Sequence, residues 1–212
     1  MILTDVTLSY GENIIASGIN AELKSGEVVC LIGRNGAGKS TLIRHILRSY
    51  GTPREVAKDI SVVLTDRIDV DGMTVRDLVA MGRSPYTGFF GKLSKMDEEI
   101  VNDALCMFSM QDYAEREVRT LSDGERQKVM ICKAVAQQTP YIILDEPTAF
   151  LDYPSKVETM QLLLSLSKKE NKGILISTHD LDIALRYCDK LWLMKDKTLN
   201  VLNPKEFSVD CL

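Results

Sequence analysis

Apolar and polar positions change their period along the chain, and these changes predict the order of its elements. The first 30 residues hold short apolar runs between turn residues, such as ILTDVTLSY before Gly11-Glu12-Asn13, which is typical of antiparallel strands joined by tight turns. The segment EVVCLIG at 27–33 is almost wholly apolar, as expected for a strand buried on both faces, and it leads into a glycine-rich turn and the helical pattern STLIRHILRSY. A strand, a loop and a helix in this order begin an α/β fold.

Helical spacing of apolar residues extends from Thr74 to about Gln138, in the stretches TVRDLVAMG, DEEIVNDALCMFSM and GERQKVMICKAVAQ. Two strand-like runs follow, YIILDE and KGILIST, with the amphipathic segment SKVETMQLLLSLSKKE between them. A strand, a helix and a strand of this length predict a right-handed crossover between parallel strands. We therefore expect a single α/β domain in which an all-helical insert interrupts the core.

The composition is that of a compact globular protein without a global attraction to polyanions. The 212 residues are 45% hydrophobic and 26% charged, with 26 Lys and Arg against 30 Asp and Glu. The net charge of -4 argues against a nucleic-acid partner, so a bound anion has to be held by local groups. The apolar runs are far shorter than the roughly 20 residues that span a bilayer, and the N-terminus lacks the pattern of a secretion signal. We expect a soluble, cytoplasmic protein.

The five cysteines are odd in number, widely scattered and without a C-x-x-C pair. This pattern predicts small packing residues, with neither a disulfide framework nor a zinc site. They are Cys30, Cys106, Cys132, Cys188 and Cys211.

A turn with the spacing G-x-x-x-x-G-K-[ST] joins the buried strand to the helix, which is where a phosphate-binding loop has to lie. Backbone N–H groups of such a loop surround phosphates, and the helix N-terminus adds its positive end. Lys39 is expected to bridge the β- and γ-phosphates, and the Ser40 hydroxyl to bind Mg²⁺. The alternative, a glycine turn that binds nothing, is disfavoured by this placement. The loop consists of Gly33, Arg34, Asn35, Gly36, Ala37, Gly38, Lys39 and Ser40.

Three further side chains follow predicted strands and so belong to the same edge of the sheet. Asp145 and Glu146 end the strand YIIL, where Asp145 can hold Mg²⁺ through water and Glu146 can polarise the water that attacks the γ-phosphate. His179 follows the strand GILIST and is expected to sense the γ-phosphate. The alternatives are a polar strand end before Pro147 and a structural histidine.

Leu121-Ser122-Asp123-Gly124-Glu125 opens the helix ERQKVMICKAVAQ. Ser122 and Glu125 have the spacing of a capping box, as do Thr74 and Asp77. A helix N-terminus with a Ser hydroxyl and a Gly backbone is also a candidate anion site. Both interpretations stay open for this segment.

Together these motifs resemble one family, the nucleotide-binding subunits of ABC transporters, over nearly the whole chain. GRNGAGKST resembles the Walker A motif, LSDGERQKV the signature motif, YIILDEP the Walker B motif with its catalytic glutamate, TAFLD the D-loop, and His179 the switch histidine. The resemblance implies a P-loop NTPase fold of the ABC type, with an N-terminal antiparallel β-subdomain and an inserted helical subdomain. Its implied divisions are 1–66 for the β-subdomain and nucleotide-binding core, 67–120 for the helical subdomain, and 121–212 for the signature helix and the rest of the core.

The resemblance also implies residue roles in an ATPase that uses ATP and Mg²⁺. Tyr10 stacks on the adenine, and two copies face each other, so that the signature residues of one close on the ATP bound by the other while Asp152 of the D-loop lies at the same seam. Catalytic roles fall to Glu146, His179 and Lys39. The nucleotide-binding set is Tyr10, Gly33, Asn35, Gly36, Ala37, Gly38, Lys39, Ser40 and Thr41; the signature set is Ser122, Asp123, Gly124 and Glu125; the Mg²⁺ ligands are Ser40 and Asp145.

Within the family, MTVRDLVAMGRSPYTGFFGKLSKMDEEIVNDAL and PTAFLDYPSK are similar to importers of iron–siderophore complexes, haem and cobalamin. This similarity implies integral membrane permease subunits as partners, faced by the segment 82–86, and indirectly a substrate-binding protein. It implies a peripheral location on the cytoplasmic face of a bacterial inner membrane.

Three departures from the family pattern stand out. Thr65-Asp66-Arg67 occupies the place of the Q-loop glutamine, so that Asp66 is the residue available there to reach Mg²⁺ or the attacking water. Asp123 stands where the family usually has glycine. A strand pair that relatives carry between Thr41 and Asp66 is missing near Gly51, and the C-terminus is short.

Two other functions remain as alternatives. The altered Q-loop position and Asp123 are compatible with an ABC-type switch or regulatory protein that binds ATP with little hydrolysis. An ABC ATPase that acts on DNA or ribosomes is less favoured, because no basic stripe or long coiled coil is present.

Overall fold

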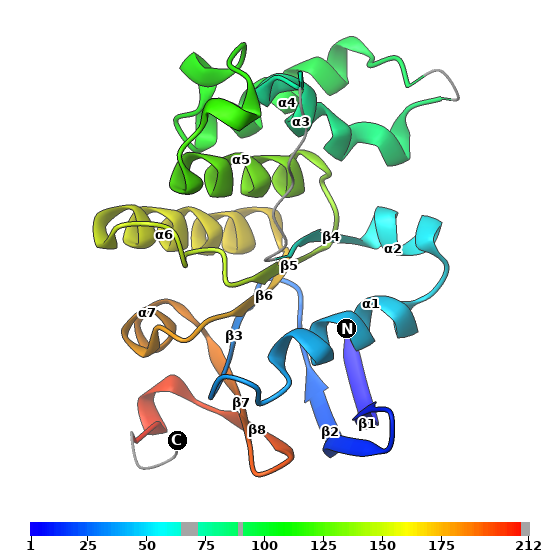
Figure 1. The fold of residues 1–212 in the computed structure, drawn as a ribbon, viewed down its shortest axis with the longest axis vertical. Coiled ribbons are helices and arrows are strands. Elements are labelled where there is room, and N and C mark those ends of the chain that lie inside the picture. Colours follow the sequence, from blue (N-terminus) through cyan, green and yellow to red (C-terminus); the bar gives the residue numbers. More distant parts are fainter. Residues whose placement is uncertain (65–71, 89–90, 209–212) are drawn as a thin grey trace.

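A six-stranded sheet forms the centre of the computed structural model, which describes residues 1–64, 72–88 and 91–208 (Figure 1). The strand order is β4-β5-β6-β3-β7-β8, parallel except for β8, which pairs antiparallel with β7. A separate antiparallel hairpin consists of β1 (Ile2–Tyr10) and β2 (Asn13–Glu22). The sheet strands are β3 (Val28–Gly33), β4 (Ile60–Val63), β5 (Tyr141–Asp145), β6 (Gly173–Ser177), β7 (Lys190–Lys195) and β8 (Thr198–Leu202).

The central strand β3 is buried on both faces, as its apolar run predicts. Val28, Cys30 and Ile32 enter one apolar cluster, whereas Val29 and Leu31 enter another. Because alternate residues of a strand point to opposite faces, β3 joins the two halves of the core. The β-rich start and the α/β core predicted from the sequence are both confirmed.

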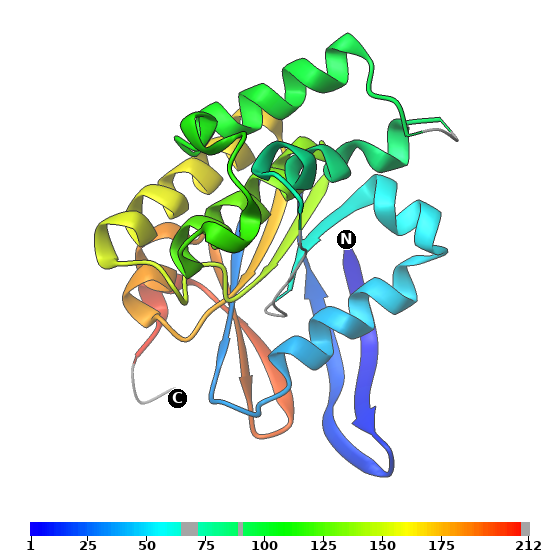
Figure 2. The ribbon, with the colours of Figure 1, turned by 45° about the horizontal axis from the view of Figure 1, so that its top comes forward.

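Helices cover the two faces of the sheet unequally (Figure 2). On one side α1 (Lys39–Tyr50) packs with the β1–β2 hairpin, and α2 (Pro53–Asp59) follows it. On the other side lie α5 (Asp123–Ala136), α6 (Tyr153–Glu170) and α7 (Leu181–Tyr187). Between β4 and α5 the described chain is helical, with α3 (Val75–Ala80), η1 (Met81–Tyr86), α4 (Lys95–Met107), η2 (Gln111–Tyr113) and η3 (Val118–Thr120); η4 (Pro204–Glu206) comes after β8.

The connection from α1 to β4 is short. The nine residues 51–59 contain only a turn and α2, with no strand in this described stretch. Thr52 caps α2 with Glu55 in a capping box, and Pro53 occupies the first helical position, where its missing N–H has no partner to lose. The prediction that this region lacks a strand pair is therefore confirmed.

Arg83 corrects the expectation that all of segment 82–86 faces a partner. Its guanidinium is buried, with Nε 2.8 Å from Asp97 Oδ1 and one Nη donating to the Ala136 carbonyl at 2.9 Å. Hydrogen bonds from Ser94 and the Arg83 pair lower the pKa of Asp97 to about 2. Arg83 therefore ties η1 to α4 and α5, whereas Met81 and Tyr86 are exposed.

The cysteines also differ from their prediction, since the structure pairs Cys30 with Cys188 as a disulfide. Cys30 lies on β3 and Cys188 directly follows α7, and their Cα atoms are 5.9 Å apart. Backbone contacts beside them, such as the Asp189 N–H on the Val28 carbonyl at 2.8 Å, draw the two segments together. A separation of 158 residues leaves no local signal of such a pairing. Cys106 and Cys132 are free thiols.

None of the helices in the described ranges is both long and apolar enough to cross a bilayer.

Candidate functional site

The carboxyl ends of three adjacent strands bring the predicted site residues together. β3 leads into the glycine-rich loop, β5 ends at Asp145, and β6 ends at Ser177, which lies opposite Asp145 in the parallel register. Glu146 and His179 follow β5 and β6 within two residues. The prediction that these groups share one sheet edge is confirmed, as expected where parallel strands end side by side.

The glycine-rich loop has a backbone conformation that residues with side chains could not readily adopt. Gly36 and Gly38 adopt φ values of 80° and 101°, in the left-handed region that favours glycine. A Cβ on Gly38 would lie 2.5 Å from Cγ2 of Ile15, on β2. Lys39 Nζ donates to the Gly33 carbonyl at 2.8 Å, so the ammonium spans the loop. Glycine adopts this backbone without strain, and the loop carries the Lys39 ammonium bound to one of its carbonyls.

Helix α1 begins in a way that suits an anion. Its N-cap is Gly38, whose position supplies no side-chain hydrogen bond, and its first turn contains no acidic residue. Among the α-helices in the described ranges, every other N-cap side chain accepts a hydrogen bond from its helix. The first N–H groups of a helix need partners, and phosphate oxygens meet that need. The residues present therefore fit a bound polyphosphate.

Ser177, on β6, connects the two acids. Its hydroxyl donates a short hydrogen bond to Asp145 Oδ1, and it accepts one from the Glu146 N–H at 3.0 Å. Both Ser177 and Asp145 are buried. Asp145 and Ser40 line the same hollow, and a carboxylate with a hydroxyl is an oxygen donor set of the kind that Mg²⁺ prefers.

Glu146 and His179 are in direct contact. Glu146 Oε2 lies 2.8 Å from Nδ1 of His179, and the Glu146 side chain is 18% exposed against 61% for His179. Glu146 also has a φ of 53°, which is unusual for a residue with a side chain. A carboxylate oriented by an imidazole at this position can accept a proton from water.

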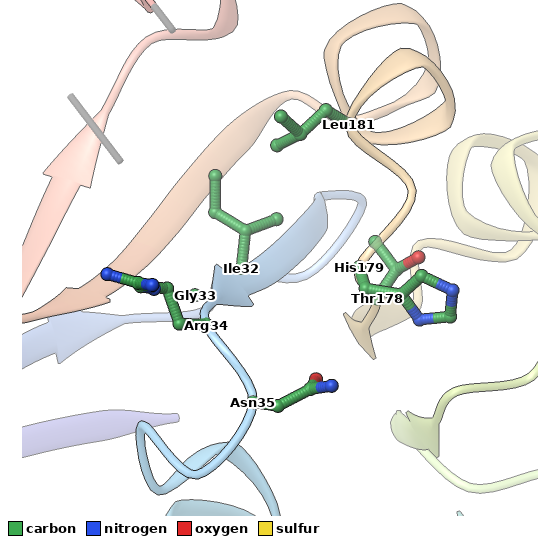
Figure 3. Close-up of a pocket in the computed structure, with 7 residues that line it drawn as sticks. All are labelled: Ile32, Gly33, Arg34, Asn35, Thr178, His179 and Leu181. Atoms are coloured by element: carbon green, nitrogen blue, oxygen red, sulfur yellow. The ribbon is translucent and has the colours of Figure 1, made fainter. Parts of the chain in front are cut away.

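Two hollows adjoin this group. One of about 360 Å³ is lined by the loop and helix start together with Ile15, Asp145 and Glu146. A larger one of about 640 Å³ lies between the loop and the segment after β6, and Figure 3 shows Asn35 and His179 facing each other across it. The phosphate loop therefore lines both hollows, the smaller together with the two acids and the larger together with His179.

The signature and D-loop residues form a different cleft. Ser122, Asp123, Gly124 and Glu125 lie with Phe150, Leu151 and Asp152 around a hollow of about 450 Å³. Ser122 caps α5 in the predicted capping box, and its hydrogen bonds lower the pKa of Glu125. Asp152 caps α6 by accepting the Ser155 N–H at 3.0 Å, and hydrogen bonds from the Ser155 side chain and N–H lower the pKa of Asp152. Within one copy, these residues do not line the cleft of the phosphate loop.

Asp123 is held on its own helix. Its Oδ1 lies 3.6 Å from Nη1 of Arg126, one turn along α5. The positive end of the helix dipole stabilises the Asp123 carboxylate, and the Arg126 guanidinium compensates part of its negative charge.

Two predicted site residues are not placed by the structure. Asp66 lies outside the described residues, and the Tyr10 side chain, at the end of β1, is likewise outside what is described. Their assigned roles stay predictions.

Sequence reasoning missed Ser177 and Ile15. Ser177 directly precedes Thr178-His179 on a strand whose partner ends in two acids, and that position was a usable signal. Ile15 contacts the loop from the β1–β2 hairpin, and only the tertiary fold reveals this contact.

Comparison with known proteins shows which family has this sequence. Residues 16–149 match the family model described as ABC transporter. An uncharacterised ABC transporter ATP-binding protein of Methanocaldococcus jannaschii is 39% identical over 208 residues, which covers 91% of this chain and 72% of that protein. A petrobactin import ATP-binding protein of Bacillus anthracis is 37% identical over 222 residues, covering 97% of this chain and 81% of that protein.

A solved structure agrees with the sequence relatives. The dimeric structure of an ABC transporter cassette has a TM-score of 0.84 and 25% identity, and the match covers 97% of this chain and 99% of that one.

The match with the Bacillus protein also bears on chain length. It extends over 222 positions, yet 97% of 212 residues is about 206, so about 16 of its positions have no residue in this chain. The matched family model, the relatives and the site geometry lead to one identification: the chain belongs to the ABC transporter family of ATP-binding proteins and is an ATPase.

Proposed function

We propose that this ATPase drives the import of an iron–siderophore complex, haem or cobalamin through a membrane permease. The observation that carries the ATP-hydrolysis part of the proposal is the Glu146–His179 contact beside the phosphate loop. Relatives support the class of cargo, because their names include petrobactin import, iron(3+)-hydroxamate import and cobalamin import. These relatives also make an ATP-binding switch with little hydrolysis the less favoured alternative.

We propose that ATP binds with its phosphates in the loop from Gly33 to Thr41. The open N–H groups of α1 and the Lys39 ammonium bind the phosphates, and Tyr10 stacks on the adenine. Ser40 and Asp145 hold Mg²⁺, which when bound neutralises charge on the phosphates. Glu146 accepts a proton from the attacking water, and His179 orients Glu146 and senses the γ-phosphate.

We propose that a second copy completes each site. The signature residues and Asp152 line a cleft separate from the phosphate loop, so they can act on ATP when they belong to the opposing copy. The dimeric cassette among the structural neighbours supports such an arrangement. The helical subdomain, residues 67–120, is proposed to face the permease, with the exposed Met81 and Tyr86 available for contact.

The proposed location is the cytoplasmic face of the membrane, with a substrate-binding protein on the opposite side. Asp66 stays the proposed stand-in for the Q-loop glutamine. No nucleic acid is proposed as a partner, because the chain carries a net charge of -4.

Glu146→Gln tests the proposal. Removing a general base lowers turnover by roughly 100-fold or more, so Mg²⁺-dependent ATP hydrolysis is expected to fall by that factor while ATP still binds. Glu98→Gln, which changes an exposed acid on α4, is the matched control and should leave turnover unchanged. Undiminished hydrolysis in Glu146→Gln contradicts the assigned base.

A transport assay tests the cargo. Cells that express this chain with its permease are expected to accumulate a labelled ferric siderophore, haem or cobalamin, and Glu146→Gln should abolish that uptake. Hydrolysis without uptake of any of the three would refute the assigned cargo and leave the ATPase intact.

A further inference from the structure

One buried hydroxyl touches both acids of the site. Ser177 is fully buried at the end of β6, directly opposite Asp145 in the register. Its Oγ donates to Asp145 Oδ1 and accepts from the Glu146 N–H at 3.0 Å. The same N–H also reaches the Ser177 carbonyl at 3.2 Å. Two consecutive catalytic positions are therefore connected to one residue on the neighbouring strand.

The chemistry of the groups determines which one donates in each hydrogen bond of Ser177. An ionised carboxylate only accepts hydrogen bonds, so the single hydroxyl proton of Ser177 is directed to Asp145. The lone pairs of the hydroxyl then face the Glu146 N–H. No hydrogen bond to Asp145 Oδ2 is found within the described part of the chain, so that oxygen stays available to a ligand.

Glu146 needs such support, because its backbone is strained. Its φ of 53° lies in the left-handed region, which costs a residue with a side chain roughly 1–2 kcal/mol. A strained conformation persists only where its surroundings hold it in place. The two acceptors of Ser177 bind the Glu146 N–H at this strained turn, and the carboxylate then meets His179 Nδ1 at 2.8 Å.

We propose that Ser177 is a positioning residue for ATP hydrolysis, whose hydroxyl fixes both the Asp145 carboxylate and the turn that aims Glu146 at its water. The inference rests on the proposed function, in which Glu146 is the base. Ser177 is fully buried and is assigned an action through the two acids that it contacts, not on the nucleotide itself.

Other buried serines show what a purely structural role looks like. Ser167 is fully buried and donates to the Lys172 carbonyl at 2.8 Å, at the far end of α6. Ser61, on β4 of the same sheet, is also fully buried, and its hydroxyl has no partner within the described part of the chain. Neither hydroxyl contacts the site, which makes Ser167→Ala a matched control for the loss of a buried hydrogen bond.

Ser177→Ala is the first test. A misplaced catalytic group costs up to about 100-fold, so kcat is expected to fall roughly 10- to 100-fold while KM for ATP changes less than about threefold. Ser177→Thr keeps the hydroxyl and should restore most of the turnover. Ser167→Ala is expected to lower the melting temperature similarly and to keep full turnover. Equal kcat losses in the two alanine variants would overturn the proposal.

A double variant separates positioning from a general effect. Groups that act as a unit are non-additive, so adding Ser177→Ala to Glu146→Gln should lower the residual turnover by a smaller factor than in the single variant, because only the part that acts through Asp145 remains. A further loss as large as in the single variant would contradict action through Glu146. If Ser177→Ala does not fold, Ser177→Cys keeps the volume with a weak donor and should show an intermediate loss of kcat.

Amide hydrogen exchange gives a readout that does not depend on hydrolysis. The Glu146 N–H is expected to exchange faster in Ser177→Ala than in the parent protein or in Ser167→Ala. If Glu146→Gln retains full turnover, the proposed base fails, and exchange still reports whether Ser177 holds this turn. Unchanged exchange at Glu146 would refute the positioning role even where the base is correct.

Discussion

Two helix N-termini of this ATPase, those of α1 and α5, are built in opposite ways. Helix α1 begins at Gly38 without a side-chain cap, and its first turn has no acid. Helix α5 begins at Ser122, whose N–H and hydroxyl each donate to Glu125 Oε2 at 2.8 Å. Its first turn contains both Asp123 and Glu125. One end is open to an anion, and the other is closed by its own side chains.

The difference indicates how the two ends take part in binding ATP. The open end of α1 has no side-chain cap to displace, and Lys39, which lines the same hollow, can keep its bond to the Gly33 carbonyl while its other ammonium protons donate to a phosphate. At α5 the Ser122 hydroxyl has to leave Glu125 before it can donate to a phosphate on another copy. The phosphate loop is thus preorganised, whereas the signature end exchanges one hydrogen bond for another. This difference predicts tight ATP binding by one copy and weaker, ATP-dependent pairing of two.

The largest effect is expected at the open end, from Lys39→Ala. Losing a charge-assisted hydrogen bond costs about 1.5–3 kcal/mol, which corresponds to roughly 10- to 100-fold weaker ATP binding. Titration of the protein with a fluorescent ATP analogue measures this change. Lys24→Ala, which removes an exposed lysine of the β2–β3 turn, should bind as the parent does. ATP affinity within twofold of the parent would show that the open end is not the phosphate site.

At the closed end, Ser122→Ala is expected to weaken ATP-driven pairing about tenfold for each of the two sites in the pair, because one hydrogen bond to phosphate is lost at each site, while ATP binding to one copy stays near normal. Analytical ultracentrifugation of Glu146→Gln protein with ATP, with and without Ser122→Ala, measures the dissociation constant of the pair.

The matched control for Ser122→Ala is Thr52→Ala. Thr52 caps α2 with Glu55 in the same geometry, at 2.7 and 2.8 Å, but on an exposed helix outside both clefts. Each change should destabilise the fold by about 1 kcal/mol through the lost cap. If Thr52→Ala impairs pairing as much as Ser122→Ala does, the effect reflects stability and not contact with ATP.

A smaller effect is expected in the titration of Glu125. Hydrogen bonds from Ser122 hold its pKa below the ordinary value of 4.5. Because the folded pKa is the lower one, the stability contributed by this cap is complete above pH 4.5 and is lost as the pH falls through the folded pKa. In an ATP-bound pair the hydroxyl leaves Glu125, so the pKa should rise towards its ordinary value. Carboxyl NMR of the free and paired states measures it, and an unchanged pKa would mean that Ser122 keeps its cap in the pair.

Much of this site was predictable because its residues follow strands. The loop, Asp145, Glu146 and His179 were placed on one sheet edge from apolar runs and the positions after them, and parallel pairing brings such positions together. The capping box of Ser122 and Glu125 was predictable for the same local reason, since its partners are three residues apart.

What the sequence did not reveal depends on contacts between distant segments. The Cys30–Cys188 pair spans 158 residues, and Arg83 is buried by α4 and α5, so neither has a local signature. Ile15 meets Gly38 only once the hairpin packs on α1. Ser177 was only partly within reach, because the crossover predicts that β5 and β6 are parallel, but neither their register nor the contact of the Ser177 hydroxyl follows from it.

The smallest effect should come from Asp123→Asn, although this position departs from the family pattern. Arg126 lies 3.6 Å from Asp123 and offsets its charge, so the carboxylate repels a phosphate less than its position suggests. Exposed pairs of this kind contribute less than about 1 kcal/mol, and turnover is expected to change by less than about threefold. Arg126→Gln should lower turnover more than Asp123→Asn, since it leaves the acid without this offset near the bound triphosphate. If turnover rises more than about tenfold in Asp123→Asn, the Asp123 carboxylate restrains hydrolysis. Both this negative charge and the Ser122 cap would then hinder phosphate binding at the N-terminus of α5.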